Sequence, residues 1–164
     1  MILLLSFTFL LLAESNSTQE LELNTLNDET IHLLAKEDRV IFKEYNQSVV
    51  FLLFFGHKCK PCLDEIPELK KLQEKAYRDL KILAIDIHGY NAKDLKAFKE
   101  EHKINYTLLT REDNRDFLTF IKAKTSWRGA LPFMLAFNKK GELKLVHIGA
   151  LNFKKFDAIY NAIK

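Results

Sequence analysis

The chain has 164 residues, of which 48% are hydrophobic and 29% charged, and its formal net charge at pH 7 is +3. This length and composition predict one globular domain with a sizeable core and exclude a wholly disordered chain. The net charge is small and the lysines are spread along the sequence, so we expect no nucleic-acid partner.

The N-terminal segment differs from the rest of the chain. Residues 2–13 are apolar apart from two hydroxyl residues, and polar residues follow. The run is shorter than the about 20 apolar residues of a membrane span, and it is typical of a secretory signal. We predict a signal peptide or an uncleaved N-terminal anchor over residues 1–15, a linker over 16–20 and a folded domain over 21–164. Either alternative places the domain in the periplasm or otherwise outside the cytoplasm.

The first predicted elements are a hairpin, a buried strand and a helix. Residues 21–34 alternate loosely around turn residues at 27–29, which predicts a β-hairpin. Residues 49–55 form a continuous apolar run, typical of a central strand covered on both faces. The next helix has Pro61 in its first turn, where the missing N–H costs nothing. Its expected buried face consists of Ile66, Leu69, Leu72 and Ala76.

Strands and helices alternate over the rest of the chain. The expected strands cover residues 80–87, 106–109, 132–138 and 143–148, and the expected helices cover residues 91 or 92–102, 113–122 and 153–163. The early crossover connections favour parallel strands, whereas the final hairpin adds antiparallel ones. The sequence therefore predicts an α/β domain with a central mixed β-sheet flanked by α-helices and an N-terminal β-hairpin extension.

The chain has two cysteines, Cys59 and Cys62, separated by Lys60 and Pro61 at the junction of the buried strand and its helix. Two thiols at this spacing can close a disulfide, and both a helix N-terminus and the Lys60 cation favour a thiolate. A loop this short removes little entropy from the unfolded chain, so the pair suits redox exchange better than structural cross-linking. We predict that Cys59 is the attacking sulfur and Cys62 the buried, resolving sulfur, with Pro61 stiffening the turn.

Three segments together resemble a known family. They are FFGHKCKPC at residues 54–62, EIP at 65–67 and WRGALP at 127–132. Over about residues 21–164 the chain resembles the extracytoplasmic TlpA/ResA/CcmG (DsbE-like) group of thiol–disulfide oxidoreductases. The resemblance implies a thioredoxin-like fold, protein-disulfide reductase activity and no cofactor or metal beyond the redox-active cysteine pair. It implies as partners exported proteins with cysteine pairs, apocytochrome c in cytochrome c biogenesis among them, and a membrane thiol–disulfide transporter that donates electrons.

The resemblance also implies catalytic roles outside the cysteine pair. A glutamate of the family lies near the active site, and Glu65 matches it; there a partly buried carboxylate could accept the proton of the resolving thiol. From the residues alone, an exposed glutamate in the first turns of the helix is an equal alternative. Pro132 matches the family's cis-proline, which would place the Leu131 backbone against the disulfide to pair with a substrate segment. Base rates alone favour a trans bond.

Four residues are assigned to substrate binding: Lys60, Pro61, Leu131 and Trp127. For Trp127, packing in the core or in its loop is the alternative. His57 either tunes Cys59 or is a flanking surface residue. Thioredoxins themselves carry a buried acid in the strand before the cysteines, but this strand is wholly apolar.

Three functional classes stay open at this point. The first is a reductase, the second an oxidant or disulfide isomerase that uses the same site, and the third a non-catalytic thioredoxin-like binding module. Lys60 between the cysteines favours the oxidising direction, whereas the resemblance favours the reducing one. A zinc site is disfavoured because the sequence has neither a second C-x-x-C nor an H-x₃₋₅-H spacing. A Cys–His hydrolase would leave the second cysteine unexplained.

Overall fold

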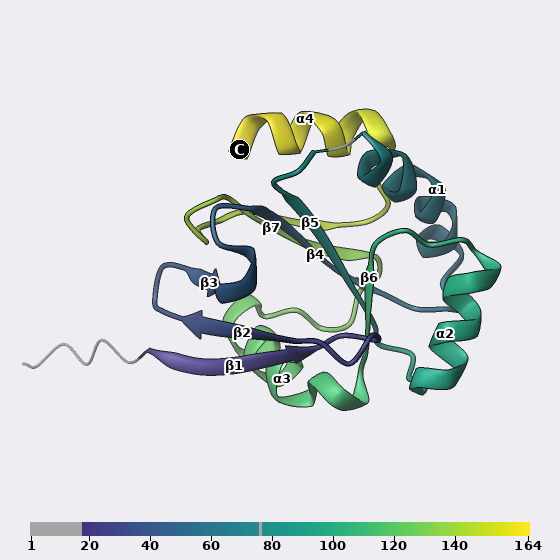
Figure 1. Ribbon diagram of the computed structural model, residues 1–164, viewed down its shortest axis with the longest axis horizontal. Coiled ribbons are helices and arrows are strands. Elements are labelled where there is room, and N and C mark those ends of the chain that lie inside the picture. The colour runs from purple at the N-terminus through teal and green to yellow at the C-terminus, as the bar shows by residue number, and fades with distance from the viewer. Residues whose placement is uncertain (1–17, 76) are drawn as a thin grey trace, which may run out of the picture.

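The described residues, 18–75 and 77–164 of a computed structural model, form two β-sheets and four α-helices (Figure 1). The strands are β1 (Gln19–Asn24), β2 (Thr30–Ala35), β3 (Val40–Phe42), β4 (Val49–Phe55), β5 (Leu80–Asp86), β6 (Thr107–Thr110), β7 (Phe133–Phe137) and β8 (Leu143–Ile148). The α-helices are α1 (Lys60–Glu74), α2 (Ala92–Glu101), α3 (Arg115–Thr125) and α4 (Phe153–Ile163), and η1 (Lys43–Tyr45) and η2 (Glu112–Asn114) are 3₁₀ turns. The expected signal or anchor and Ala76 lie outside these residues, and β1 begins at Gln19, inside the expected linker.

The main sheet has the strand order β6-β5-β4-β7-β8. β4 runs parallel to β5 and antiparallel to β7, which confirms the predicted mixed sheet. All seven residues of β4 are buried, as expected for a continuous apolar run at the centre of a sheet with both faces covered. Because the carboxyl ends of β4 and β5 meet at one edge, the segments that leave these two strands lie together there.

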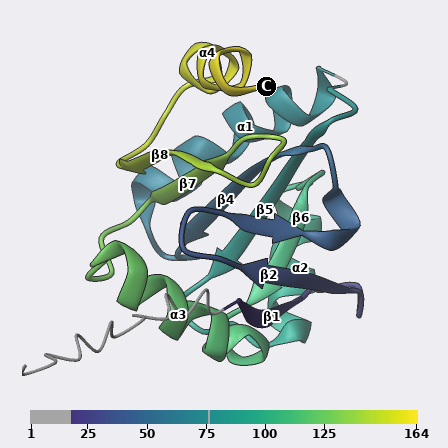
Figure 2. The same cartoon turned by 90° about the vertical axis from the view of Figure 1, so that its left-hand side faces the viewer.

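Both faces of the main sheet are covered (Figures 1 and 2). On one face, α1, α2 and α4 pack in a core cluster that includes Phe51 and Leu53 of β4. On the other face, α3 and the small sheet β1-β2-β3 pack in a cluster that includes Val50, Leu52 and Phe54. Alternate residues of β4 therefore belong to opposite layers, as the two-residue period of a strand requires.

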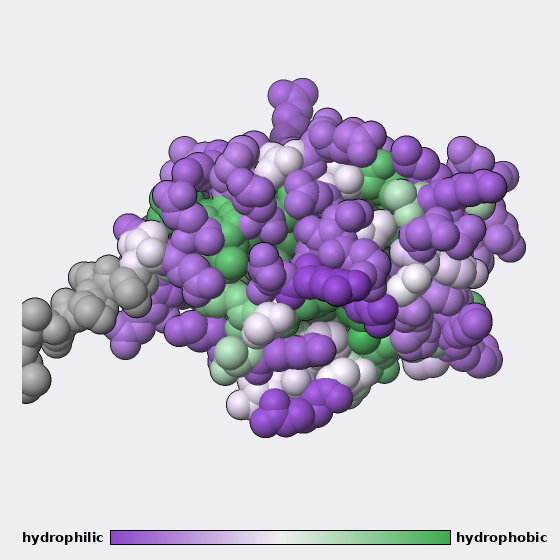
Figure 3. Space-filling view, turned by 90° about the horizontal axis from the view of Figure 1, so that it is seen from below, coloured by the Kyte–Doolittle hydropathy of each residue, from purple (hydrophilic) through white to green (hydrophobic). Residues whose placement is uncertain are grey.

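The surface of the described residues is mostly polar. Hydrophilic residues cover most of the face seen in Figure 3, and hydrophobic ones show only in small areas between them. The exposed large hydrophobic side chains lie on β8, at the edge of the main sheet: Leu143, Val146 and Ile148. Within residues 18–75 and 77–164, none of the helices combines the length and the apolar character that a bilayer crossing needs.

The predicted N-terminal hairpin is confirmed, because β1 and β2 pair antiparallel. Asp28 in the connecting turn has φ 61°, in the left-handed region that aspartate tolerates better than most residues. A third strand, β3, extends this sheet; it has only three residues, too few for a periodic pattern to predict. The backbone N–H of Leu26 donates to the Leu108 carbonyl oxygen at 2.9 Å, which links the hairpin to β6 of the main sheet.

The side chain of Asn114 makes a second link between the two sheets. Its Oδ1 accepts a hydrogen bond from the Asn24 N–H at 2.8 Å. Its Nδ2 donates to the carbonyl oxygens of Asn24 at 3.0 Å and of Thr110 at 2.8 Å. The helix expected over residues 113–122 begins instead at Arg115, because the turn η2 precedes it and places the buried Asn114 against β1.

We predict that Asn114→Ala lowers the free energy of unfolding by about 2–3 kcal/mol, since it removes the hydrogen-bond partner of backbone groups of the half-buried Asn24 and the buried Thr110. Urea denaturation measures this loss. The matched control is Asn161→Ala on α4, where the side chain is exposed and the change should stay within about 0.5 kcal/mol. Equal effects of the two substitutions would contradict the proposed link.

Candidate functional site

The two cysteines lie where β4 leads into α1, at the end of the main sheet formed by the carboxyl ends of β4 and β5. They are joined by a disulfide, and their Cα atoms are 5.2 Å apart. Cys59 is the N-cap of α1, and its Sγ accepts a hydrogen bond from the Cys62 N–H at 3.4 Å. Cys62 is only 2% exposed, whereas Cys59 is half-buried. One sulfur is therefore more accessible to a partner and the other lies in the core, as the sequence predicts.

The start of α1 supplies the positive potential at Cys59. The first backbone N–H groups of a helix have no partner within the helix, and the helix dipole is positive at this end. Lys60 contributes less than the sequence suggests: its side chain is 84% exposed, and its Nζ pairs with the Asp64 carboxylate at 3.0 Å. Pro61 follows it in the first turn and is exposed. Both residues lie at the rim of the site, where a substrate can reach them.

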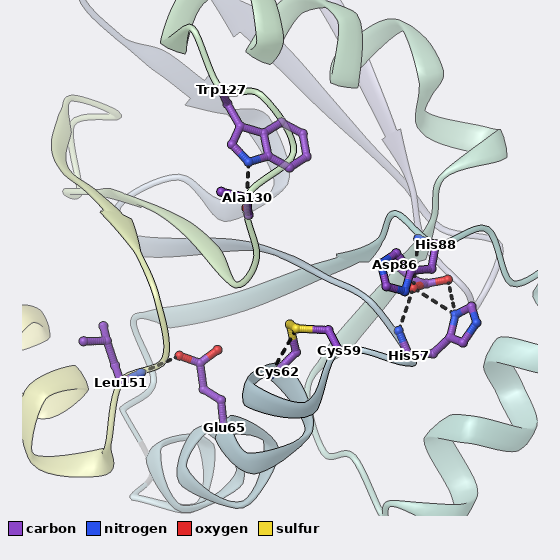
Figure 4. The surroundings of a disulfide bond; sticks show 9 residues. All are labelled: His57, Cys59, Cys62, Glu65, Asp86, His88, Trp127, Ala130 and Leu151. Carbon is purple, nitrogen blue, oxygen red and sulfur yellow. Dashed lines mark hydrogen bonds and ion pairs between the residues drawn. A yellow bond between two sulfur atoms is a disulfide. The ribbon is translucent and has the colours of Figure 1, made fainter.

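Glu65 is buried, on the side of α1 that carries the disulfide (Figure 4). It is 4% exposed, and its Oε1 accepts a hydrogen bond from the Leu151 N–H at 2.8 Å. Burial raises the pKa of this carboxyl from 4.5 to about 7, and the bond from Leu151 opposes that shift only in part. The alternative of an exposed glutamate is therefore wrong. Glu65 can hold or release a proton near neutral pH, one helical turn from Cys62.

Asp86, which the sequence analysis did not select, is a buried acid at the same edge (Figure 4). It ends β5, is 0% exposed and accepts hydrogen bonds from the backbone N–H groups of His57, His88, Gly89 and Tyr90 at 2.8–3.3 Å. The Nδ1 of His57 also lies 3.1 Å from its Oδ2. This carboxylate thus holds the segment before Cys59 and the segment after β5 together.

His57 is a packed residue of the site. Its side chain is 5% exposed, so the alternative of a flanking surface residue is wrong. The ring stacks on Tyr90, with centroids 3.4 Å apart and planes 5° from parallel. Figure 4 shows this ring directed toward Asp86 and away from the disulfide. The contacts of the His57 ring are thus with Asp86 and Tyr90, and its link to Cys59 is the backbone between them.

One signal in the sequence could have pointed to Asp86. Asp86 lies near the end of the strand predicted over residues 80–87. The carboxyl ends of neighbouring parallel strands meet at the same end of a sheet, so this carboxylate would lie near the end of the strand that leads to the cysteines. The strand before the cysteines has no buried acid; here the buried acid comes from its neighbour.

The loop before β7 approaches the disulfide from the other side (Figure 4). The peptide bond between Leu131 and Pro132 is cis, as the resemblance implies. Leu131 is half-buried and packs against both core clusters, one of which contains Cys59 and Cys62. The structure thus brings Leu131 and Pro132 to the end of the sheet that carries the cysteine pair.

Trp127 supports this loop from the core. It is 4% exposed, and its ring centroid lies 5.0 Å from that of Phe54 and 5.2 Å from that of Phe133. Its Nε1–H donates to the Ala130 carbonyl oxygen at 2.8 Å. Of the two interpretations of Trp127, the structure favours packing over direct substrate contact.

Solved structures share this fold at low sequence identity. StoA from Bacillus subtilis superposes with a TM-score of 0.65 at 15% identity, covering 87% of this chain and 97% of that one. A secreted thiol-disulfide isomerase from Corynebacterium glutamicum gives a TM-score of 0.70 at 15% identity, covering 90% and 84%. A pneumococcal exposed lipoprotein thioredoxin, from Streptococcus pneumoniae, gives 0.65 at 19%, covering 88% and 99%. The thioredoxin-like fold predicted from the resemblance is confirmed.

Sequence comparisons identify the family. The thioredoxin-like protein YneN of Bacillus subtilis (strain 168) is 23% identical over 112 residues, which are 66% of this chain and 61% of that protein. The chain thus spans about six tenths of the length of this relative. The model of the AhpC/TSA family matches residues 17–146. A match over this much of the chain, which includes Cys59 and Cys62, means that the protein belongs to the AhpC/TSA family.

Proposed function

We propose that this protein is an extracytoplasmic oxidoreductase that reduces disulfides of exported proteins through Cys59 and Cys62. One observation carries the proposal: an accessible sulfur at a helix N-terminus is bonded to a buried sulfur, and a buried carboxyl with a pKa of about 7 lies on the same side of that helix. A non-catalytic binding module would need neither the buried carboxyl nor the difference in exposure between the sulfurs.

The reaction begins with the reduced pair. The Cys59 thiolate attacks one sulfur of the substrate disulfide, so that a new S–S bond forms and the substrate S–S bond breaks. The other substrate sulfur leaves as a thiolate and takes a proton from solvent. The N-terminus of α1 favours the Cys59 thiolate. Asp86 holds the segment before Cys59 in place by accepting a hydrogen bond from the His57 N–H.

The second step releases the substrate. Cys62 gives its proton to the Glu65 carboxylate and attacks the Cys59 sulfur, which breaks the mixed disulfide. The remaining substrate sulfur leaves as a thiolate and is protonated, and Glu65 returns its proton to solvent. Two electrons have then passed to the substrate, and Cys59 and Cys62 form the disulfide. A dithiol must reduce the pair again, and we propose a membrane thiol–disulfide transporter for that role.

The location and the substrates belong to the same proposal. The signal-like N-terminal sequence supports export to the periplasm or another extracytoplasmic compartment. Two proteins with this fold are described as secreted and as an exposed lipoprotein, which agrees with that location. The substrates we propose are exported proteins with cysteine pairs, apocytochrome c among them. Leu131 is the residue we assign to backbone pairing with a substrate segment, beside Lys60 and Pro61.

The main prediction is that Cys62→Ser traps substrates. Without the resolving sulfur, the mixed disulfide on Cys59 persists, so the full-length variant expressed in cells that export it should form covalent complexes that dithiothreitol releases. Non-reducing electrophoresis and mass spectrometry identify the captured proteins. Cys59→Ser is the control and should capture none.

The direction of electron flow is tested by the reduction potential of the pair. A reductase should have a potential close to that of thioredoxin, about −270 mV, whereas a strong oxidant lies near −120 mV. Equilibration with glutathione or dithiothreitol measures it. A value at the oxidising end would replace reduction by oxidation or isomerisation as the function, and absence of any trapped complex would support the binding module.

Glu65→Gln should slow the reaction and stabilise the fold. The variant keeps an oxygen acceptor for the Leu151 N–H but cannot accept a proton, so release of the mixed disulfide should slow about 100-fold. In the wild type this step should speed up as the pH rises through about 7, because Glu65 must be ionised to accept the Cys62 proton. In single-turnover kinetics, the rate of this step in the Glu65→Gln variant should not rise as the pH passes about 7.

Glu65→Gln should slow the reaction but raise the free energy of unfolding above about pH 7. The folded chain keeps the Glu65 proton up to about pH 7, whereas the unfolded chain loses it near 4.5. The free energy of unfolding should therefore fall by about 3 kcal/mol as the pH rises between these values. Glu65→Gln should remove that fall, which makes the variant more stable at pH 8 and equally stable at pH 4. Glu74→Gln, at an exposed position of α1, is the control and should change neither the rate of mixed-disulfide release nor the free energy of unfolding.

Asp86→Asn should destabilise the segment that holds Cys59. The amide keeps the shape of the side chain but replaces one acceptor oxygen by a donor that faces N–H groups. We expect the free energy of unfolding to fall by about 2–3 kcal/mol, measured by urea denaturation. Asp116→Asn on the exposed surface of α3 is the control, with a change of about 0.5 kcal/mol or less. A similarly small change for Asp86→Asn would rule out its role as the anchor of this segment.

A further inference from the structure

A cavity of about 360 Å³ lies between two loops that reach the cysteine pair. Ile87 and Gly129 are among its lining residues. Ile87 directly follows Asp86, and its N–H donates to the Phe55 carbonyl oxygen at 2.9 Å, at the end of the strand that leads to Cys59. Gly129 precedes Pro132 by three residues. The cavity therefore borders the same end of the main sheet as the disulfide, on the side of α3.

The charged residues that line this cavity are all cations: Arg111, Lys122 and Arg128. Arg111 pairs with Glu112 at 2.8 Å. Lys122 and Arg128 have no carboxylate within ion-pairing distance in the part of the chain that the structure describes. Lys122 lies over the Trp127 ring, with its Nζ 5.9 Å from the centroid. Lys122 and Arg128 thus give the cavity positive charge that no carboxylate of the described residues pairs with, next to the Trp127 ring.

Loop geometry brings this charge to the same end of the main sheet as the reacting sulfurs. In Figure 4 the loop that carries Trp127 and Ala130 and the segment that carries His88 both approach the end of α1 that holds the disulfide. Arg128 belongs to the first loop, and Arg111 lies against Gly89 of the second, because a Cβ atom on that glycine would be 3.2 Å from the Arg111 Nη2. A polypeptide that presents a disulfide to Cys59 would have its neighbouring residues within reach of these cations.

We propose that this cavity binds acidic side chains that flank the disulfide of a protein substrate; the inference rests on the proposed function. Carboxylates suit the site because guanidinium and ammonium groups bind them by charge-assisted hydrogen bonds, and the planar Arg128 group can do so with two parallel bonds. Clustered charge also steers an oppositely charged partner during encounter and sets which partner is preferred. The cysteine pair performs the exchange, and the cavity selects acidic substrates for it.

Three disulfide-bonded peptides of equal length test the proposal, with Glu, Gln or Lys on both sides of the cysteines. The full-length protein, reduced at Cys59 and Cys62, is mixed with each peptide, and the second-order rate constant of peptide reduction is measured at low and high salt. The cavity variant is Lys122→Gln with Arg128→Gln. The matched control is Lys154→Gln with Lys155→Gln on α4, two exposed cations on the opposite face of the main sheet.

At low salt the wild type should reduce the Glu peptide about tenfold faster than the Lys peptide, which corresponds to two weak exposed ion pairs. This preference should shrink at high salt. The cavity variant should lose most of it, the control should keep it, and all three proteins should reduce the Gln peptide at similar rates.

Equal rates for the Glu and Lys peptides in the wild type would overturn the proposal. So would an equal loss of preference in the two variants, because net charge alone would then explain it. A cavity variant that is slow with the Gln peptide would also contradict it, since the cavity would then serve exchange itself. If no peptide is reduced by any of the proteins, the proposed function fails and the inference fails with it.

Discussion

The parallel pairing of β4 with β5 sets Phe55 opposite Asp86, and most of the site depends on this register. Both strands end at the same edge, so the segment that leads to Cys59 and the segment that follows β5 must share it. Several of their backbone N–H groups point at the buried Asp86 side chain, which gives them partners inside the protein. The Asp86 carboxylate accepts several of these groups at once, which allows β4 to pass into α1 with Cys59 at the N-cap.

The two buried acids of the site have different environments. Asp86 accepts hydrogen bonds from several N–H groups and contacts His57, so this buried side chain has many hydrogen-bond partners. Glu65 accepts one bond, from Leu151, and burial therefore raises its pKa to about 7. The first acid suits a structural anchor, and the second suits proton transfer at neutral pH. The number of donors around each carboxyl explains this division.

Much of the fold follows from local patterns in the sequence. The apolar run at 49–55 coincides with β4, and Pro61 lies in the first turn of α1 as predicted. The cysteine pair could be found because only two residues separate Cys59 from Cys62 in the chain. The contact of Asp86 with His57 could not, since 29 positions separate them and only the strand register brings them together. Cations around the cavity are dispersed in the same way, and β3 is too short to leave a periodic signal.

Cys59, Cys62 and Glu65 all lie at the start of α1, within seven consecutive residues. The separation of the two sulfurs and the carboxyl is therefore set by the rise and pitch of one helix, about 1.5 Å per residue and 5.4 Å per turn. A small shift of the helix over the sheet, such as docking of a large partner could cause, would carry all three groups as a rigid unit. The spacing of these three groups is thereby insulated from changes elsewhere in the fold, whereas the pKa of Glu65 still depends on its burial and on the Leu151 N–H.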